Sequence, residues 1–176
     1  MERLTKELHD AILRTWLPRI FWTLALIAVL VFIFSNSLAS GEVSSEQSYA
    51  VTEQVQEVAR VVAPDSKIAT ATGDDFVQLH INVRTAAHFC QFALLGAVAF
   101  WCYRSYTRKK LFALFPIVGT AATAFMDECL QLSSEGRAWE WVDIAVDVSG
   151  GMLGIVFALL VCIVCRTLIK KRKENG

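Results

Sequence analysis

The amino-acid sequence predicts an all-α integral membrane protein with four transmembrane helices, cytoplasmic N- and C-termini, and an amphipathic helix outside the membrane. Hydrophobic residues make up 55% of the 176 residues, which is too many for an average soluble domain. Four apolar stretches are long enough to cross about 30 Å of hydrocarbon, which takes roughly 20 helical residues. The basic residues gather on one side of those stretches. We expect a single membrane domain over residues 1–176.

The four predicted spans run over residues 16–34, 85–103, 111–131 and 142–165. Few charged residues interrupt them. The third contains Pro116 and Gly119, which a membrane helix tolerates where its neighbours satisfy the freed backbone groups. The first has an alternative interpretation as a cleaved signal peptide, because small residues end "FIFSNSLAS", although the leader before its apolar core would be long.

The positions of the basic residues predict the orientation. All but four of the seventeen lysines and arginines lie on one side of the spans. The exceptions are Arg60, Lys67, Arg84 and Arg137. Because cytoplasmic loops are enriched in lysine and arginine, both termini are predicted to be cytoplasmic. The zero net charge hides this asymmetry, and no nucleic-acid partner is predicted.

The predicted outer loop, residues 36–84, is the only sizeable part outside the membrane. Four valines recur there at helical spacing: Val51, Val55, Val58 and Val62. Ser44 with Gln47 resembles a capping box, and Pro64 is a stop signal. We expect an amphipathic helix whose apolar stripe lies either on the membrane surface or on the helix bundle.

The five cysteines lie within the predicted spans or at their ends, and none lies in the outer loop. We therefore predict no disulfide framework. Cys162 and Cys165 are three residues apart near the inner face, and helix packing is the expected role. Lipidation or metal binding by this pair is the alternative.

A polar cluster is predicted at the outer ends of the last three spans. It comprises Arg84, His88 and Gln91 on the second span, Asp127, Glu128 and Gln131 on the third, Arg137 in the following connection, and Asp143 and Asp147 on the fourth. Residues three or four apart share a helix face. Because the chain alternates in direction, the end of the third span lies beside the starts of the second and fourth. We expect a common acidic pocket in the outer leaflet.

The glycines that follow Asp147 support this orientation. Gly150, Gly151 and Gly154 continue the same stripe, and their spacing permits a close helix approach inside the bundle. The four carboxylates outnumber the two arginines, and an ionised group in a membrane helix costs about 2.5–3.5 kcal/mol at the bilayer centre. Protonation, water, a cation or a cationic ligand must relieve this imbalance. No cofactor and no metal site is predicted, because the spacing matches no strong ligand pattern.

Several stretches together resemble the VanZ-like family. They are "FSNS" after the first span, "VRTAAHFCQFALLG" from Val83 to Gly96, "DECLQ" followed by "GR", and "DIAVDVSGGMLG" from Asp143 to Gly154. They cover nearly the whole chain in the expected order. The resemblance places the family's characteristic positions on Arg84, His88, Phe89, Asp127, Glu128, Gln131, Arg137, Asp143, Asp147, Gly150 and Gly154.

Four positions depart from the family pattern. Thr85 stands where lysine is frequent, Gln91 and Phe92 where an acid and a tyrosine are frequent, and Leu130 where histidine is common. The missing imidazole and acid weaken the case for metal-centred or proton-relay activity. For function, the resemblance implies a multi-pass protein of the bacterial cell membrane, linked to low-level resistance to the lipoglycopeptide antibiotic teicoplanin.

Three classes of function remain open. In the first, which we expect, the acidic pocket binds an outer-leaflet amphiphile: a lipid-linked cell-wall precursor or the lipoglycopeptide, among membrane lipids. In the second, the carboxylates and His88 act as acid and base of an enzyme on a lipid-linked or phosphorylated substrate, although no nucleophile motif or "HExxH" is present. In the third, the protein is a scaffold and Arg84 and Arg137 form structural ion pairs with Asp127 and Asp147.

Overall fold

The computed structural model describes residues 2–107, 114–134 and 139–174, and these form five α-helices. They are α1 (Glu2–Ser37), α2 (Gly41–Val62), α3 (Asp74–Tyr106), α4 (Leu114–Gln131) and α5 (Trp141–Glu174). No strand occurs within the described ranges. The prediction of an all-α fold is confirmed.

Three helices are long and apolar enough to cross a membrane: Ile12–Ser37 of α1, the whole of α3 and the whole of α5. Large apolar side chains are exposed along α1 and α5, as expected of helices that face lipid. The described part of α4 is not among these candidates. Its C-terminal end carries two carboxylates and a glutamine, and residues 111–113 of the predicted span lie outside the described residues. A fourth span therefore stays a prediction.

The helices extend beyond the predicted spans. α3 begins at Asp74, about three turns before residue 85. Hydropathy marks only the part of a helix that suits lipid, and no proline interrupts this polar extension of α3. The extension packs on α2. The ring of His80 in α3 stacks on the ring of Tyr49 in α2, with their centroids 3.9 Å apart.

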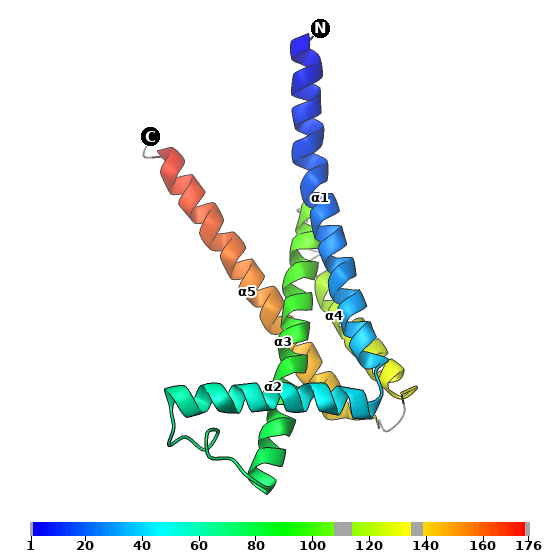
Figure 1. Cartoon of the computed structure of the whole chain (residues 1–176). Coiled ribbons are helices and arrows are strands. Elements are labelled where there is room, and N and C mark those ends of the chain that lie inside the picture. The colour runs from blue at the N-terminus through cyan, green and yellow to red at the C-terminus, as the bar shows by residue number, and fades with distance from the viewer. Residues whose placement is uncertain (1, 108–113, 135–138, 175–176) are drawn as a thin grey trace.

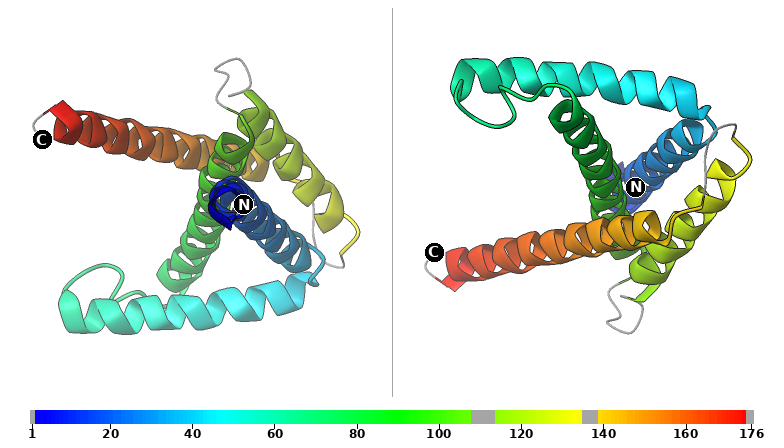
Figure 2. Two further views of the ribbon diagram at one scale, coloured as in Figure 1. Left: turned by 90° about the horizontal axis from the view of Figure 1, so that it is seen from above. Right: turned by 90° about the horizontal axis from the view of Figure 1, so that it is seen from below.

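The four longitudinal helices form a bundle that α2 crosses at one end. Figure 1 shows α1, α3, α4 and α5 running lengthwise, with both chain ends at the end opposite α2. The end-on views of Figure 2 show that α2 lies along one side of the bundle. α3 contacts each of the other four helices. The first turns of α5 meet the middle of α3, where His88 lies 3.5 Å from Asp147.

Glycines bring α3 and α5 into backbone contact. A methyl group added to Gly150 would collide with the carbonyl oxygen of Phe89, so only glycine permits this approach. We call this contact the glycine seam; it comprises Gly96, Gly150, Gly151 and Gly154. His88 precedes Phe89, and Asp147 lies about one turn before Gly150. The glycine seam therefore fixes His88 beside Asp147.

The amphipathic helix exists, but it begins one turn earlier than expected. Ser40 is the N-cap, and its side-chain oxygen accepts a hydrogen bond from the backbone N–H of Val43 at 3.3 Å. The predicted cap at Ser44 is therefore wrong, since an adequate capping residue lies just upstream. The end of the helix at Val62, before Pro64, agrees with the predicted stop signal.

α2 buries polar side chains and exposes apolar ones. Thr52 and Gln56 are buried, and the side-chain amide of Gln56 donates to the carbonyl oxygen of Ala71 at 2.7 Å. Val58 and Val62 are 63% and 77% exposed. The C-terminal half of the apolar stripe of α2 therefore does not cover the described part of the bundle.

Candidate functional site

A cavity of about 360 Å³ lies at the end of the bundle that α2 crosses. Its wall is built from the C-terminal end of α1, the first turns of α2, the middle of α3 and the C-terminal part of α4. The polar residues of this wall are Asn36, Ser37, Ser44, Gln47, Ser48, Arg84, His88, Gln91 and Asp127. Phe32, Ile33, Val51, Val83 and Ala87 complete it. A cavity with this mixed lining can hold a polar group beside an apolar one.

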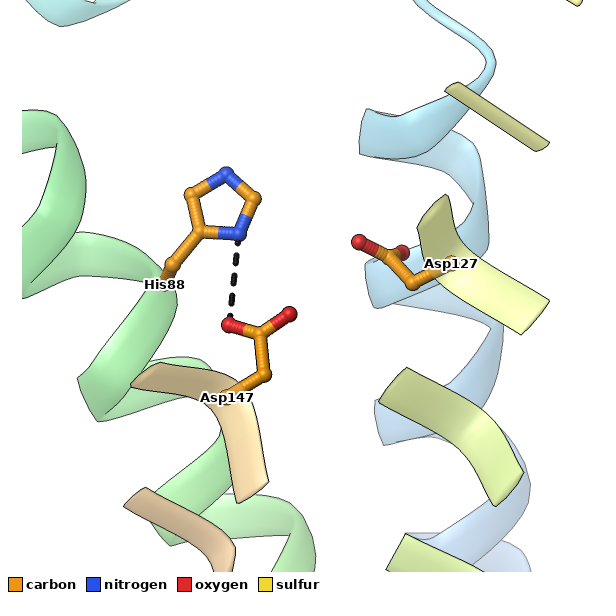
Figure 3. A group of neighbouring side chains, drawn as sticks. All are labelled: His88, Asp127 and Asp147. Carbon is orange, nitrogen blue, oxygen red and sulfur yellow. Dashed lines mark ion pairs between the residues drawn. The ribbon is translucent and has the colours of Figure 1, made fainter. Parts of the chain in front are cut away.

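Three ionisable side chains from three helices converge beside this cavity. His88, Asp127 and Asp147 each offer one ligand atom, and these atoms lie within 4.8 Å of one another. We call these residues the His–Asp–Asp group. Figure 3 shows the carboxylate of Asp127 turned toward the pair formed by His88 and Asp147. The Nδ1 atom of His88 lies 3.5 Å from the Oδ1 atom of Asp147.

The members of the group differ in exposure and in hydrogen bonding. The His88 side chain is 19% exposed, whereas the Asp147 side chain is 2% exposed. Neither His88 Nδ1 nor Asp147 Oδ1 has a hydrogen-bond partner among the described residues. A buried polar atom normally has such a partner, so these two atoms require an explanation.

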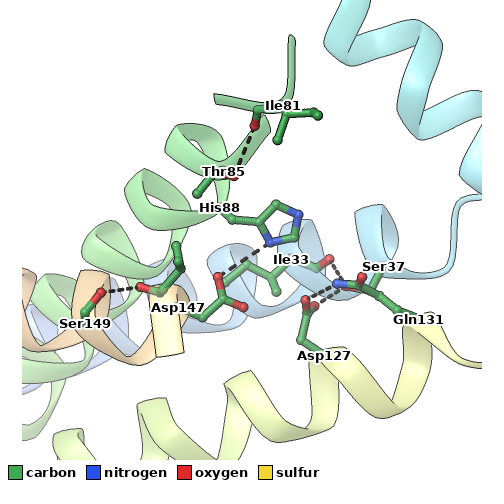
Figure 4. Close-up of polar contacts among 10 residues, drawn as sticks. Ile33, Ser37, Ile81, Thr85, His88, Asp127, Gln131, Asp147 and Ser149 are labelled. Carbon is green, nitrogen blue, oxygen red and sulfur yellow. Dashed lines mark hydrogen bonds and ion pairs between the residues drawn. The ribbon is translucent and has the colours of Figure 1, made fainter. Parts of the chain in front are cut away.

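Asp127, by contrast, is held from two sides (Figure 4). The side-chain amide of Gln131 donates to Asp127 Oδ2 at 2.7 Å. The hydroxyl of Ser37 contacts Asp127 Oδ1 and also lies 2.8 Å from the carbonyl oxygen of Ile33, and its single proton serves one of these two acceptors at a time. Because Ser37 and Gln131 come from α1 and α4, the carboxylate of Asp127 is oriented where these helices meet.

The structure gathers six members of the predicted cluster at this place. Arg84, His88, Gln91 and Asp127 line the cavity, Asp147 lies beside His88, and Gln131 contacts Asp127. Arg84 is half-buried, and it makes no ion pair with any described residue. The proposed structural ion pairs from Arg84 to Asp127 or Asp147 are therefore not formed.

The two other described members, Glu128 and Asp143, do not line the cavity. Glu128 is buried, but its Oε1 atom accepts a hydrogen bond from the backbone N–H of Glu140 at 2.7 Å, at the approach to α5. Asp143 is half-buried, about one turn before Asp147. Arg137 lies outside the described residues. Asp127 lines the cavity and Glu128 does not, because successive residues of a helix point in different directions.

Sequence reasoning did not assign the residues that α1 and α2 contribute to the cavity. Ser37 is the most important of these, since it contacts Asp127. Two signals were available. Ser44, Gln47 and Ser48 have helical spacing on α2, and the serines of "FSNS" lie directly after an apolar run.

A comparison with protein-family models adds an independent observation. The model described as VanZ/LLP1 matches residues 21–164, which include the described members of the polar cluster and the glycine seam. No curated protein and no solved structure matches the chain. The match covers most of the sequence, and three helices are apolar enough to span a membrane. The chain is therefore a membrane protein that belongs to the VanZ/LLP1 family.

Proposed function

We propose that this protein binds the head group of an outer-leaflet amphiphile, either a lipid-linked cell-wall precursor or a lipoglycopeptide, and thereby contributes to teicoplanin-type resistance. In this proposal the protein lies in the bacterial cell membrane with four spans and cytoplasmic termini. Residues 111–131 form the third span in chain order, in addition to the spans of α1, α3 and α5, and α2 lies on the extracytoplasmic side. All but four of the lysines and arginines lie on one side of the predicted spans, and this asymmetry favours the orientation.

The cavity carries the proposal. Polar side chains from α1, α2, α3 and α4 line it, and the buried carboxylate of Asp127 is among them. Such a concentration of polar groups in a membrane helix bundle is costly, and it usually marks a binding site or a pathway. Hydrogen-bond donors and acceptors at fixed positions suit sugar, peptide or amine groups.

The surroundings of the cavity suit the apolar part of an amphiphile. Phe32 lies in the wall and is 51% exposed, on a helix face that continues with other exposed apolar residues. α2 supports the same placement, because its exposed valines suit the boundary between head groups and acyl chains. A head group can occupy the cavity while its acyl chains stay in the bilayer.

Resistance and binding measurements test this proposal. Asp127→Asn keeps the size of the side chain and removes its charge. We expect it to lower the teicoplanin concentration that a sensitive host survives, and to weaken binding of a lipid-linked precursor to the purified chain. The amount of protein in the membrane should not change. Asp75→Asn is the matched control, because Asp75 is an exposed acid at the start of α3 outside the cavity.

The comparison of these two variants decides the question. Full resistance and full precursor binding in Asp127→Asn, at normal abundance, would contradict the proposal. Equal losses in Asp127→Asn and Asp75→Asn would point to a general effect of surface charge and would also count against it.

The pair formed by His88 and Asp147 favours a second candidate function. An imidazole beside a carboxylate can accept and return a proton, and this pair borders the cavity. The second candidate is thus an enzyme acting on a lipid-linked or phosphorylated envelope substrate. Purified chain that leaves such substrates unchanged over a long incubation, with and without added divalent metal, would exclude it for the substrates tested.

A further inference from the structure

The His–Asp–Asp group contains an unexplained contact. His88 Nδ1 and Asp147 Oδ1 face each other at 3.5 Å, and neither forms a hydrogen bond with a described residue. Asp127 Oδ1 and Oδ2 already accept hydrogen bonds or contacts from Ser37 and Gln131. We infer that His88, Asp127 and Asp147 together bind one divalent metal ion of the zinc type.

The distances fit such an ion. Zinc lies about 2.0–2.2 Å from imidazole nitrogen and carboxylate oxygen, so two ligands of a tetrahedral ion are about 3.4 Å apart. The 3.5 Å separation of His88 Nδ1 and Asp147 Oδ1 matches that value, although it is too long for a good hydrogen bond. The three ligand atoms all lie within 4.8 Å of one another, so a shortening of at most about 1.4 Å brings every pair to the separation in a tetrahedral site.

Charge and burial support the same inference. Asp127 and Asp147 are each 1% exposed, and two carboxylates so close together in a poorly hydrated place repel each other. No described lysine or arginine forms an ion pair with either of them. A divalent cation balances both charges and gives a ligand bond to Asp147 Oδ1, which is buried, lies 3.5 Å from His88 and has no hydrogen-bond partner among the described residues.

The identity of the ligand atoms selects the class of metal. An imidazole nitrogen in the set favours zinc and similar transition metals over calcium and magnesium, which prefer oxygen ligands alone. Three protein ligands leave a fourth position open, as in zinc sites that bind water or a substrate. Here His88 and Asp127 border the cavity, so that position faces the space available to a ligand.

The neighbours of Asp127 have the arrangement of groups that orient a metal ligand. Ser37 and Gln131 hold its carboxylate on the side away from His88 and Asp147, as Figure 4 shows. Such hydrogen bonds fix the direction of a metal-binding oxygen, and their loss typically lowers metal affinity about 10–100-fold. The inference goes beyond the proposed function, because the metal is measured without any amphiphile present.

The test measures zinc on the purified full-length chain without an affinity tag, after metal removal by a chelator. We expect one zinc ion per chain, by elemental analysis and by titration calorimetry. Asp147→Asn and His88→Gln should each lower the affinity by about 100-fold or more, since a lost ligand costs at least as much as a lost neighbour of a ligand. Ser37→Ala should lower it about 10-fold.

Two matched controls separate metal binding from general damage. His80→Gln changes another buried histidine of α3, and Asp143→Asn changes an acid about one turn before Asp147. Both should bind zinc as tightly as the unmodified chain. Zinc binding that survives in Asp147→Asn and His88→Gln, for example at Cys162 and Cys165, would overturn the inference, and so would an unmodified chain that binds no zinc.

A spectroscopic variant covers the case in which the ligand variants fold poorly. His88→Cys replaces the imidazole with a thiolate, which is also a zinc ligand. With cobalt as a substitute for zinc, this variant should show a thiolate-to-metal charge-transfer band that the unmodified chain lacks. An ion pair that serves only structure would give no such band, so its absence in folded His88→Cys would also overturn the inference.

Discussion

The helices α3 and α5 meet in two contrasting ways within a few residues of each other. In the glycine seam their backbones touch, and the contact depends on shape alone. About one turn nearer to α2, His88 and Asp147 face each other as ionisable groups without a hydrogen bond. The backbone contacts of the seam need no further partner, whereas His88 Nδ1 and Asp147 Oδ1 both lack a hydrogen bond with any described residue. We conclude that the seam acts as a frame that holds a reactive or ligand-binding pair at a fixed separation.

Filling the glycine seam should have the largest effect. A methyl group at Gly154 would collide with the backbone of Ala93, which cannot move without separating the two helices. We expect Gly154→Ala to lower the free energy of unfolding by about 3 kcal/mol, because overpacking forces backbone shifts. The measurement is the midpoint of thermal unfolding of the purified chain in one detergent.

The control for this variant is Gly119→Ala on α4. A Cβ atom at Gly119 would meet nothing within 4 Å. Alanine is a better helix former than glycine by up to about 1 kcal/mol in water, so this variant should unfold at the same temperature or slightly higher. Equal unfolding temperatures for Gly154→Ala and Gly119→Ala would show that the seam is not a tight contact.

A smaller effect is expected at Glu128, which does not line the cavity and instead accepts a hydrogen bond from the backbone just before α5. Glu128→Ala removes the carboxylate that accepts the hydrogen bond from the Glu140 N–H. We expect it to lower the free energy of unfolding by about 2 kcal/mol. Glu128→Gln keeps an oxygen at that place and should cost less than about 1 kcal/mol. Thermal unfolding measures both. If glutamine is as damaging as alanine, the charge of Glu128 matters and the residue belongs functionally with Asp127.

The contrast between Asp127 and Glu128 also shows what sequence can predict. Apolar runs and helix-stop signals are local, and they correctly indicated α1, α3, α5 and the end of α2. The convergence of His88, Asp127 and Asp147 followed from alternating helix direction, which needs no side-chain detail. Both adjacent carboxylates are buried, and which of them faces the cavity depends on the rotation of α4 about its axis, which packing alone sets.

The role of Ser37 could not be predicted for a related reason. Its contact with Asp127 joins residues ninety positions apart in the chain. It exists because α1 ends beside the last turns of α4, and just after α4 the Ser134 hydroxyl donates to the backbone carbonyl of Ser37 at 3.1 Å. No pattern within "FSNS" states which helix will lie opposite. The same holds for the first turns of α2, whose position depends on how the chain folds back after Ser37.

The smallest effect on stability is expected at Ser37, which contacts the Asp127 carboxylate and lies outside the glycine seam. Ser37→Ala removes one of the two groups that hold Asp127, while Gln131 still donates to the other oxygen. The free energy of unfolding should therefore fall by only about 1 kcal/mol, the usual net value of one hydrogen bond. Resistance to teicoplanin should fall more than this small loss of stability explains, because the Asp127 carboxylate becomes free to rotate.

Ser134→Ala is the control for this variant. It removes a hydrogen bond to the backbone of Ser37 and leaves Asp127 untouched, so it should change stability slightly and resistance not at all. Equal resistance in Ser37→Ala and Ser134→Ala would mean that the orientation of Asp127 does not matter for resistance. Only the glycine seam would then be supported as a feature that positions the polar residues.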